Sequence, residues 1–127
     1  ILTLTGFVGG AIYNEGDLDI VNTVFASNTA NNNAGGGEGG AIYNSLTATM
    51  TITQAKFSSN SAHYGGAIVN WGTLEIGQST FNSSTAVEEG GAIINSGILN
   101  VLETSFNNNT STTLNGGGLF NDGSMTI

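Results

Sequence analysis

The sequence contains no cysteine and no proline, and its basic side chains amount to one lysine without any arginine. In the absence of cysteine the chain can form neither a disulfide framework nor a thiolate metal site. The single lysine stands against nine acidic residues, which leaves a formal net charge of -8. This balance argues against nucleic acid and anionic membranes as partners, because binding phosphate groups requires Lys and Arg.

Long apolar runs are missing as well, and none approaches the roughly 18 residues of a transmembrane helix. Apolar residues recur two positions apart, which is typical of strands, and no window shows the three-and-four spacing of an amphipathic helix. The first residues, 1–5, are strand-like and do not resemble a signal peptide. We therefore expect an all-β protein in which this segment is not inserted in a membrane.

What the sequence does contain is a repeat. The block Gly-Gly-Ala-Ile-Tyr-Asn begins at Gly9 and again at Gly39, and variants of it begin at Gly65, Gly90 and Gly116. The successive intervals are 30, 26, 25 and 26 residues. Self-similarity at a nearly fixed period of this length indicates a solenoid.

A second block, Leu-x-Ile-x-x-small-x-Phe, follows each glycine block at a fixed offset. Three short strands and three turns in about 25 residues predict a right-handed parallel β-helix. Residues 1–127 are expected to form one such segment of about five coils, which begin near residues 9, 39, 65, 90 and 116. A glycine also lies two residues after the Asn of the first block and is predicted to have a positive φ. These turn glycines are Gly16, Gly72, Gly97 and Gly123.

Equivalent residues of stacked coils form columns with a spacing of about 4.8 Å along the rod. The apolar residues of both blocks are predicted to fill the interior, and the Asn of the first block then points inward as well. The inward columns are Ile12, Ile42, Ile68, Ile93 and Leu119; Leu18, Met50, Leu74, Leu99 and Met125; Ile20, Ile52, Ile76, Val101 and Ile127; and Phe25, Phe57, Phe81 and Phe106. The predicted internal amide ladder consists of Asn14, Asn44, Asn70, Asn95 and Asn121.

Between the two inward residues of each first-block strand lies one residue that must point outward. These outward residues are Tyr13, Tyr43, Val69, Ile94 and Phe120, and we call them the outer stripe. A contiguous exposed apolar patch usually marks a contact surface. The alternative is that an overlying loop or a locally altered pleat buries the stripe, and the sequence does not decide between exposure and burial.

Two further features depart from the regular repeat. Residues 26–38 form a connection about five residues longer than its counterparts, and its Gly-rich sequence predicts a mobile loop that bulges from the rod. Both ends of the sequence fall inside the repeat pattern, which predicts a segment or a polymerising unit with open strand edges. Its end-to-end contacts would be made by Leu2, Leu4, Met125 and Ile127.

Residues that could carry out chemistry are sparse. A polysaccharide lyase or hydrolase needs clustered carboxylates, and the nearest in sequence are Glu15, Asp17 and Asp19. A calcium ion would need about six to eight oxygen ligands there, so we interpret these three as solvated turn residues. His63 has no triad partner or second ligand at a suggestive spacing, and Trp71 either stacks on a sugar ring or packs in its turn. We predict no catalytic residue, no cofactor and no metal site.

The pairing of Gly-Gly-Ala-Ile with Phe-x-x-Asn, in register over essentially the whole chain, resembles the repeats of chlamydial polymorphic outer membrane proteins and related bacterial surface β-helix proteins. Those chlamydial proteins are autotransporter adhesins, so the resemblance implies an extracellular or cell-surface protein with an adhesive or structural role. We predict a non-enzymatic β-solenoid that stacks end to end into a surface filament. Its partners would be further copies of itself, a cell-surface protein or a glycan. The alternative is a polysaccharide-binding or polysaccharide-degrading β-helix protein.

Overall fold

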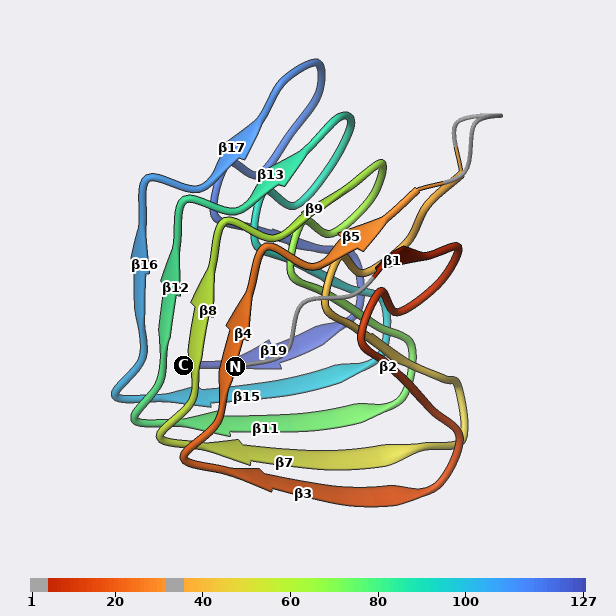
Figure 1. Cartoon of the computed structure of the whole chain (residues 1–127). Helices are drawn as coiled ribbons and strands as arrows, with labels where there is room; N and C mark the ends of the chain where they lie inside the picture. The colour runs from red at the N-terminus through yellow and green to blue at the C-terminus, as the bar shows by residue number, and fades with distance from the viewer. Residues whose placement is uncertain (1–4, 32–35) are drawn as a thin grey trace.

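The chain folds into a parallel β-solenoid in the computed structural model, which describes residues 5–31 and 36–127 (Figure 1). These residues contain no helix, as the two-residue periodicity predicts. Equivalent strands of successive coils pair in parallel and form four sheets. The prediction of an all-β parallel solenoid is therefore confirmed. Within the described ranges there is also no helix that could cross a membrane.

Each sheet stacks equivalent strands of successive coils, so the sheets form the sides of the rod (Figure 1). The strands of the glycine block are β2 (Ile12–Asn14), β6 (Ile42–Asn44), β10 (Ile68–Asn70), β14 (Ile93–Asn95) and β18 (Leu119–Asn121). The second block supplies the longest strands: β3 (Asp17–Val21), β7 (Thr49–Thr53), β11 (Thr73–Gly77), β15 (Ile98–Leu102) and β19 (Ser124–Thr126). The Phe residues lie on β4 (Val24–Ala26), β8 (Lys56–Ser58), β12 (Thr80–Asn82) and β16 (Ser105–Asn107).

A fourth sheet distinguishes the structure from the predicted three strands per coil. Its strands are β1 (Thr5–Gly6), β5 (Thr29–Ala30), β9 (Ser61–Ala62), β13 (Thr85–Ala86) and β17 (Thr110–Ser111). Strands of two residues show no readable alternation, so the sequence pattern does not reveal them. The predicted count of about five coils is not confirmed, because the Phe sheet has four strands where the other three sheets have five. The right-handed sense stays a prediction.

The corners of the coil depend on single residues in the left-handed region of φ. The prediction of a positive φ at Gly16, Gly72, Gly97 and Gly123 is wrong, and the first glycine of each glycine pair has it instead, for example Gly65 with a φ of 59°. Gly97 meets a different requirement, because a Cβ there would collide with the carbonyl oxygen of Gly72 in the preceding coil. The non-glycine corners with positive φ are Asn22, Gln54, Gln78 and Glu103 after the second block, and Ser27, Ser59, Ser83 and Asn108 after Phe.

The predicted apolar columns fill the interior of the middle coils. Phe25, Phe57 and Phe81 are buried, and their ring centroids lie 4.8 and 4.4 Å apart along the stack. The prediction of burial is wrong at the last coil, where Met125 is 37% and Ile127 is 87% exposed. No further coil of the described chain covers these two side chains.

The predicted amide ladder is present and runs along the rod. Each Asn Nδ2 donates to the Oδ1 of the Asn in the next coil, over 2.8 Å from Asn14 to Asn44 and over 2.7 Å from Asn70 to Asn95. The Nδ2 of Asn44 also donates to the backbone carbonyl of Thr73 at 3.1 Å. The ladder therefore supplies hydrogen-bond partners to polar groups that would otherwise be unpaired in the interior.

A second, unpredicted ladder is built from the Asn of the Phe-x-x-Asn pattern. Asn60 accepts a hydrogen bond from the backbone N–H of Asn28 at 2.9 Å and donates one to the carbonyl of Phe25 at 3.0 Å. Asn109 likewise accepts from the N–H of Ser84 at 3.0 Å. Ser84 interrupts this ladder, because its buried hydroxyl has no hydrogen-bond partner among the described residues.

The inserted connection, residues 26–38, was predicted to bulge from the rod as a mobile loop. The prediction is wrong for its first part, because β5 keeps its place in the fourth sheet and both Asn28 and Ala30 are buried. At the other end, Glu38 returns to the stack through single parallel bridges to Val8 and Tyr64. The centre of the predicted loop, residues 32–35, lies outside the described residues.

Candidate binding groove

The outer stripe faces away from the core, but its members differ in exposure. Tyr13 is 52% exposed, whereas Val69 is 2% and Ile94 is 6% exposed. Tyr43 and Phe120 are half-buried. The stripe is therefore open at the first coil and buried at Val69 and Ile94, and its role as a contact surface stays a prediction.

Val69 and Ile94 are covered by a glycine of their own coil. A Cβ on Gly65 would lie 2.7 Å from Cγ2 of Val69, and one on Gly90 would lie 2.6 Å from Cγ1 of Ile94. Both glycines also have a positive φ, which disfavours a larger residue at either position. Because Val69 and Ile94 are short and pack against these glycines, the surface is recessed there between the rings of Tyr43 and Phe120.

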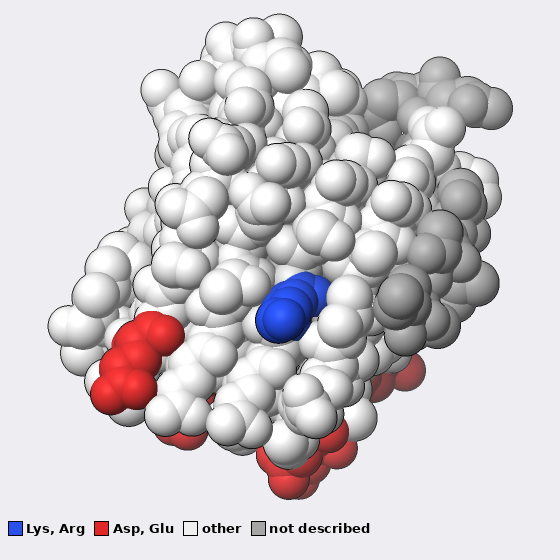
Figure 2. Space-filling view, turned by 60° about the vertical axis from the view of Figure 1, so that its left-hand side comes forward, with Lys and Arg blue, Asp and Glu red and all other residues white. Residues whose placement is uncertain are grey.

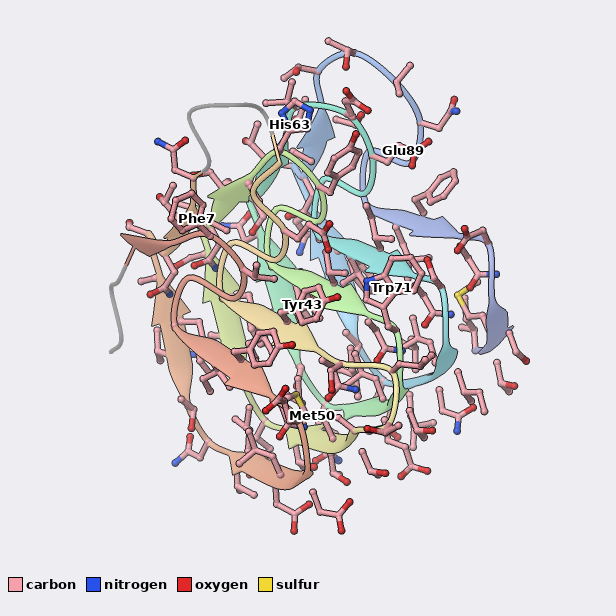
Figure 3. All side chains as sticks on the ribbon, turned by 90° about the vertical axis from the view of Figure 1, so that its right-hand side faces the viewer. Phe7, Tyr43, Met50, His63, Trp71 and Glu89 are labelled. Carbon is pink, nitrogen blue, oxygen red and sulfur yellow. The ribbon has the colours of Figure 1, made fainter. Side chains whose placement is uncertain are left out.

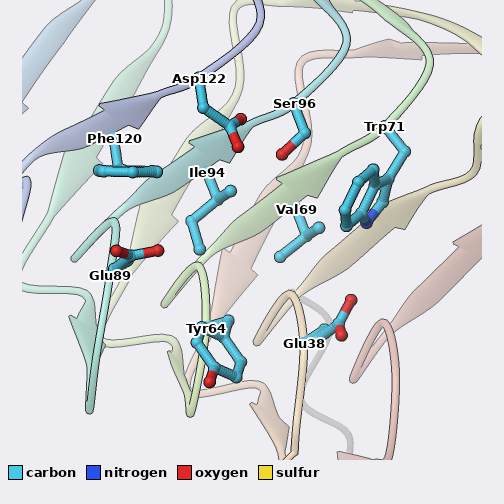
Figure 4. A pocket seen from close by; sticks show the side chains of 9 residues that line it. All are labelled: Glu38, Tyr64, Val69, Trp71, Glu89, Ile94, Ser96, Phe120 and Asp122. Atoms are coloured by element: carbon cyan, nitrogen blue, oxygen red, sulfur yellow. The ribbon is translucent and has the colours of Figure 1, made fainter.

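This low stretch is the floor of a groove of about 230 Å³ (Figure 4). The two walls are columns of residues from successive coils, one just before the glycine pairs and one just after the ladder Asn. The first wall consists of Glu38, Tyr64 and Glu89, the second of Trp71, Ser96 and Asp122, and the floor of Val69 and Ile94, with the ring of Phe120 at one end. We call this site the stripe groove.

The register of the repeat positions the first wall. Glu38 forms a parallel bridge with Tyr64, and the N–H of Gly65 donates to the carbonyl of Glu89 at 3.0 Å. The three wall residues thus lie on successive coils with a spacing of about 4.8 Å. Tyr64 is consequently flanked by a carboxylate-bearing residue on each side (Figure 4).

Trp71 is the largest residue of the second wall. It follows Asn70 in the turn between two strands and is 41% exposed. The stacked turn of the next coil carries Ser96, whose N–H donates to the carbonyl of Asn70 at 2.8 Å, and the coil after that carries Asp122. Figure 3 shows Trp71 and Tyr43 on the same face of the rod. Trp71 is thus a turn residue whose indole also lines the groove.

Contacts around Tyr64 shift the pKa values of Tyr64 and Glu88. A hydrogen bond to Glu88 raises the pKa of Tyr64, and burial and the charges of neighbouring glutamates raise it further. The same hydrogen bond, together with one from His63, lowers the pKa of Glu88. His63 Nε2 lies 3.0 Å from Glu88 Oε1. Tyr64 therefore stays protonated and its glutamate partner stays ionised at neutral pH.

No lysine or arginine lines the groove in the described part of the chain. The one lysine of the sequence, Lys56, lies on β8 in a different sheet and projects from a mostly uncharged face (Figure 2). Tyr43, the neighbour of Val69 in the stripe, has a pKa raised by burial and then by the charge of Glu38. The stripe groove thus combines aromatic rings, an aliphatic floor and carboxylates without a basic counterpart.

The last coil of the groove contains both sequence patterns of the repeat. Phe106 and Asn109 form the last Phe-x-x-Asn, and Gly116 begins the last glycine block, which carries Phe120 of the stripe. Residues 103–122 match the Chlamydia polymorphic membrane protein repeat. The predicted resemblance is thereby confirmed. No curated protein and no solved structure matches the chain.

The stretch that matches the polymorphic membrane protein repeat contributes to both the interior and the groove. Phe106 packs against the core and Asn109 belongs to the second ladder, whereas Phe120 and Asp122 line the groove. The patterns that identify the repeat are therefore those of the interior. The wall columns differ from coil to coil, as Glu38, Tyr64 and Glu89 illustrate.

The structure places the other predicted residues outside the stripe groove. Leu2 and Leu4 lie outside the described residues, and Met125 and Ile127 are exposed on the last coil. In the described ranges no group of three or more His, Asp or Glu side chains is arranged to hold a metal ion. The acids of the first turn are exposed: Glu15, Asp17 and Asp19.

The spacing of the repeats could have revealed side-chain contacts that the sequence analysis did not predict. The spacing indicated no partner for His63, yet His63 and Glu88 each lie two residues before a glycine pair, so stacking brings them together. Tyr64 and Glu89 each precede a glycine pair by one residue. Alignment of the columns outside the two blocks would therefore have identified the first wall.

Proposed function

We propose that the protein is a non-enzymatic adhesive module of a bacterial surface, which presents the stripe groove to a partner molecule. The observation that carries the proposal is the groove itself, where aromatic rings and an aliphatic floor meet on the outside of a rod with a closed core. The matched repeat is named after Chlamydia membrane proteins, which supports an extracellular or cell-surface location.

A groove of this kind suits binding. Aromatic side chains in a pocket are the residues that most often dominate the affinity of an interface. Tyr64 and Trp71 come from opposite walls, and the stacked coils hold both backbones in place. Little conformational entropy is lost on binding when a site is preorganised in this way. The solenoid acts as a rigid carrier, and its outer columns carry recognition.

The test is adhesion of protein-coated beads to cultured epithelial cells. Val69→Tyr raises the floor of the groove without changing the interior, because the two preceding coils already carry Tyr at the paired position. We expect this variant to lose most of the bound beads. Thr80→Tyr, exposed on β12 in another sheet, is the matched control and should bind as wild type does. Equal adhesion of V69Y and wild type would contradict the proposal.

We further propose that copies of the module stack end to end into a filament. The supporting observation is the direction of the first amide ladder, in which each Asn donates toward the following coil. Asn121 on β18 therefore presents a donor, and Asn14 on β2 an acceptor, at opposite ends of the ladder. Head-to-tail stacking would continue the ladder and cover Met125 and Ile127.

Electron microscopy with sedimentation of the purified protein tests the filament. Filaments with an axial repeat of roughly 24–29 Å, or five to six coil spacings, support end-to-end stacking. Ile127→Lys should then abolish them, whereas Thr80→Lys, exposed on β12 and away from both ends of its sheet, should not. Monodisperse short rods of the wild type at the same concentration would contradict the filament and leave the adhesive function standing.

A polysaccharide-binding or polysaccharide-degrading rod is the alternative function. One observation favours it: Glu38 and Glu89 lie on either side of Tyr64, two coil spacings or about 9.6 Å apart along the stack. This is the spacing of the two backbones, and flexible glutamate side chains can bring the carboxylates within the roughly 6.5–9.5 Å that separates them in inverting glycosidases. Turnover of a polysaccharide by wild type, abolished in both Glu38→Gln and Glu89→Gln, would favour this alternative over adhesion alone.

A further inference from the structure

Three carboxylates line the stripe groove beside its apolar floor. Glu38 and Glu89 stand in one wall and Asp122 in the other, around the rings of Tyr64 and Trp71 (Figure 4). Carboxylates are not needed to support an apolar floor, and each costs desolvation when a neutral ligand covers it. The carboxylates therefore indicate which class of ligand the groove binds.

Aromatic faces and carboxylates favour the same class of ligand. A cation within about 6 Å of a ring centroid is attracted to the face of Trp or Tyr. Nearby carboxylates add a Coulombic attraction. A neutral sugar would gain from the rings and could donate hydroxyl hydrogen bonds to the carboxylates, but it would gain no net Coulombic attraction, and an anionic sugar would be repelled. A cation gains from both.

We propose that the stripe groove binds lysine or arginine side chains presented by a partner protein. This inference rests on the proposed adhesive function and names the chemistry of its partner. Long basic side chains have an apolar stem and a charged end, and such a stem can lie on apolar surface while the charge stays at the rim. Val69 and Ile94 offer that surface, and Glu89 offers a rim charge.

The charge of the whole chain identifies the source of the cation. The protein has a net charge of -8, one lysine and no arginine, so a second copy of the chain cannot supply a cluster of basic side chains. Lys56 lies in another sheet and does not fill the groove of its own molecule. The occupant is therefore a different protein with a basic surface, and the negative field accelerates its approach at low salt.

The sequence contains one tryptophan, so the fluorescence of Trp71 reports on the groove without a label. The probe is a trilysine peptide with acetylated N-terminus and amidated C-terminus. Its matched control carries Nε-acetyl-lysine at all three positions, which keeps the length and removes the charge. We expect the trilysine peptide to change Trp71 emission in a saturable manner and the acetylated peptide to have no effect at the same millimolar concentration.

Two glutamine variants separate the groove from general attraction to an acidic protein. Glu89→Gln should weaken the trilysine peptide about threefold to fivefold, the range of a partly solvated ion pair. Glu75→Gln removes the same charge from an exposed position on β11, in another sheet, and should leave the affinity unchanged. Binding by wild type should also weaken when salt is raised, because screening reduces the attraction.

Several results would overturn the cationic partner. These are equal binding of the acetylated peptide, equal weakening in E89Q and E75Q, no response to trilysine, or tighter binding of a neutral hexasaccharide that E89Q does not affect. If V69Y abolishes adhesion but trilysine neither binds nor competes with the beads, the adhesive function stands and the cationic partner is refuted. If V69Y leaves adhesion intact, the adhesive function itself has failed.

Discussion

Ser84→Asn should stabilise the protein by completing the second ladder. Ser84 stands where the flanking coils carry Asn60 and Asn109, and its hydroxyl is buried without a partner in the described structure. An Asn at this position would accept from the N–H of Asn60, as Asn60 itself accepts from Asn28. Its amide would donate to the carbonyl of Phe57 in the preceding coil, as the amide of Asn109 donates to the carbonyl of Phe81 at 3.0 Å.

The magnitude follows from these two hydrogen bonds. Each buried neutral hydrogen bond contributes about 0.5–1.5 kcal/mol, and removing the unpaired hydroxyl adds about 1 kcal/mol. Ordering the longer side chain and fitting its extra atoms offset about 1 kcal/mol of this gain. The expected net gain is about 2 kcal/mol. For 127 residues the entropy of unfolding is about 0.27 kcal/mol/K, so the melting temperature should rise by about 7 °C.

Thermal denaturation followed by circular dichroism measures this rise. Ser105→Asn, on the exposed side of β16, is the control and should stay within about 1–2 °C of wild type. Asn60→Ser copies the interruption into the coil before and should lower the melting temperature by a similar amount. An unchanged or lower melting temperature for S84N, with a normal β spectrum, would refute the ladder argument.

Three further predictions concern the first ladder, the glycines and pH. Asn70→Ala removes two ladder hydrogen bonds from a fully buried site and should cost about 3–4 kcal/mol in urea denaturation, so a loss below about 1 kcal/mol would contradict it. Gly91→Ala places a Cβ against backbone of neighbouring coils and should prevent folding, whereas Gly77→Ala enters open space and should melt normally; identical circular dichroism of the two variants would refute the close-approach argument. The lowered pKa of Glu88 means that ionisation stabilises the fold above the unfolded value of 4.5, and that this contribution is lost as the pH falls below it. Glu88→Gln should therefore melt earlier than wild type at pH 7, this difference should shrink as the pH falls below 4.5, and an equal difference at pH 7 and pH 3 would contradict the argument.

The repeat made the interior predictable from the sequence. Fixed intervals define columns, and columns define which side chains stack, so the Phe stack and the first Asn ladder follow from spacing and strand parity alone. The same reasoning failed at Met125 and Ile127, because burial depends on a following coil and not on parity. Spacing also led to a positive φ being predicted at the wrong glycines. A turn that needs a positive φ and a backbone that passes too close for a Cβ both require glycine, so the residue type alone does not tell which requirement applies.

The groove could not be predicted from the blocks that define the repeat. Its walls are formed by positions that change from coil to coil, so they carry no repeat signal. Its depth depends on the difference in size between Val69 or Ile94 and the rings above and below them in the stripe. Only the outward direction of the stripe was accessible from strand alternation. The contact of His63 with Glu88 could have been predicted by aligning the residues that precede each glycine pair, because the two occupy the same position in successive coils.

The stripe groove is a gap in a stack of rings, and this has a consequence for how such a protein diversifies. The gap exists where two successive coils carry aliphatic side chains between Tyr43 and Phe120. Replacing Tyr43 by an aliphatic residue and Ile94 by an aromatic one would move the gap by one step, about 4.8 Å, along the rod. None of the interior columns would change. A descendant chain could thus shift, lengthen or close its recognition site by one or two outward substitutions while its interior columns stay the same.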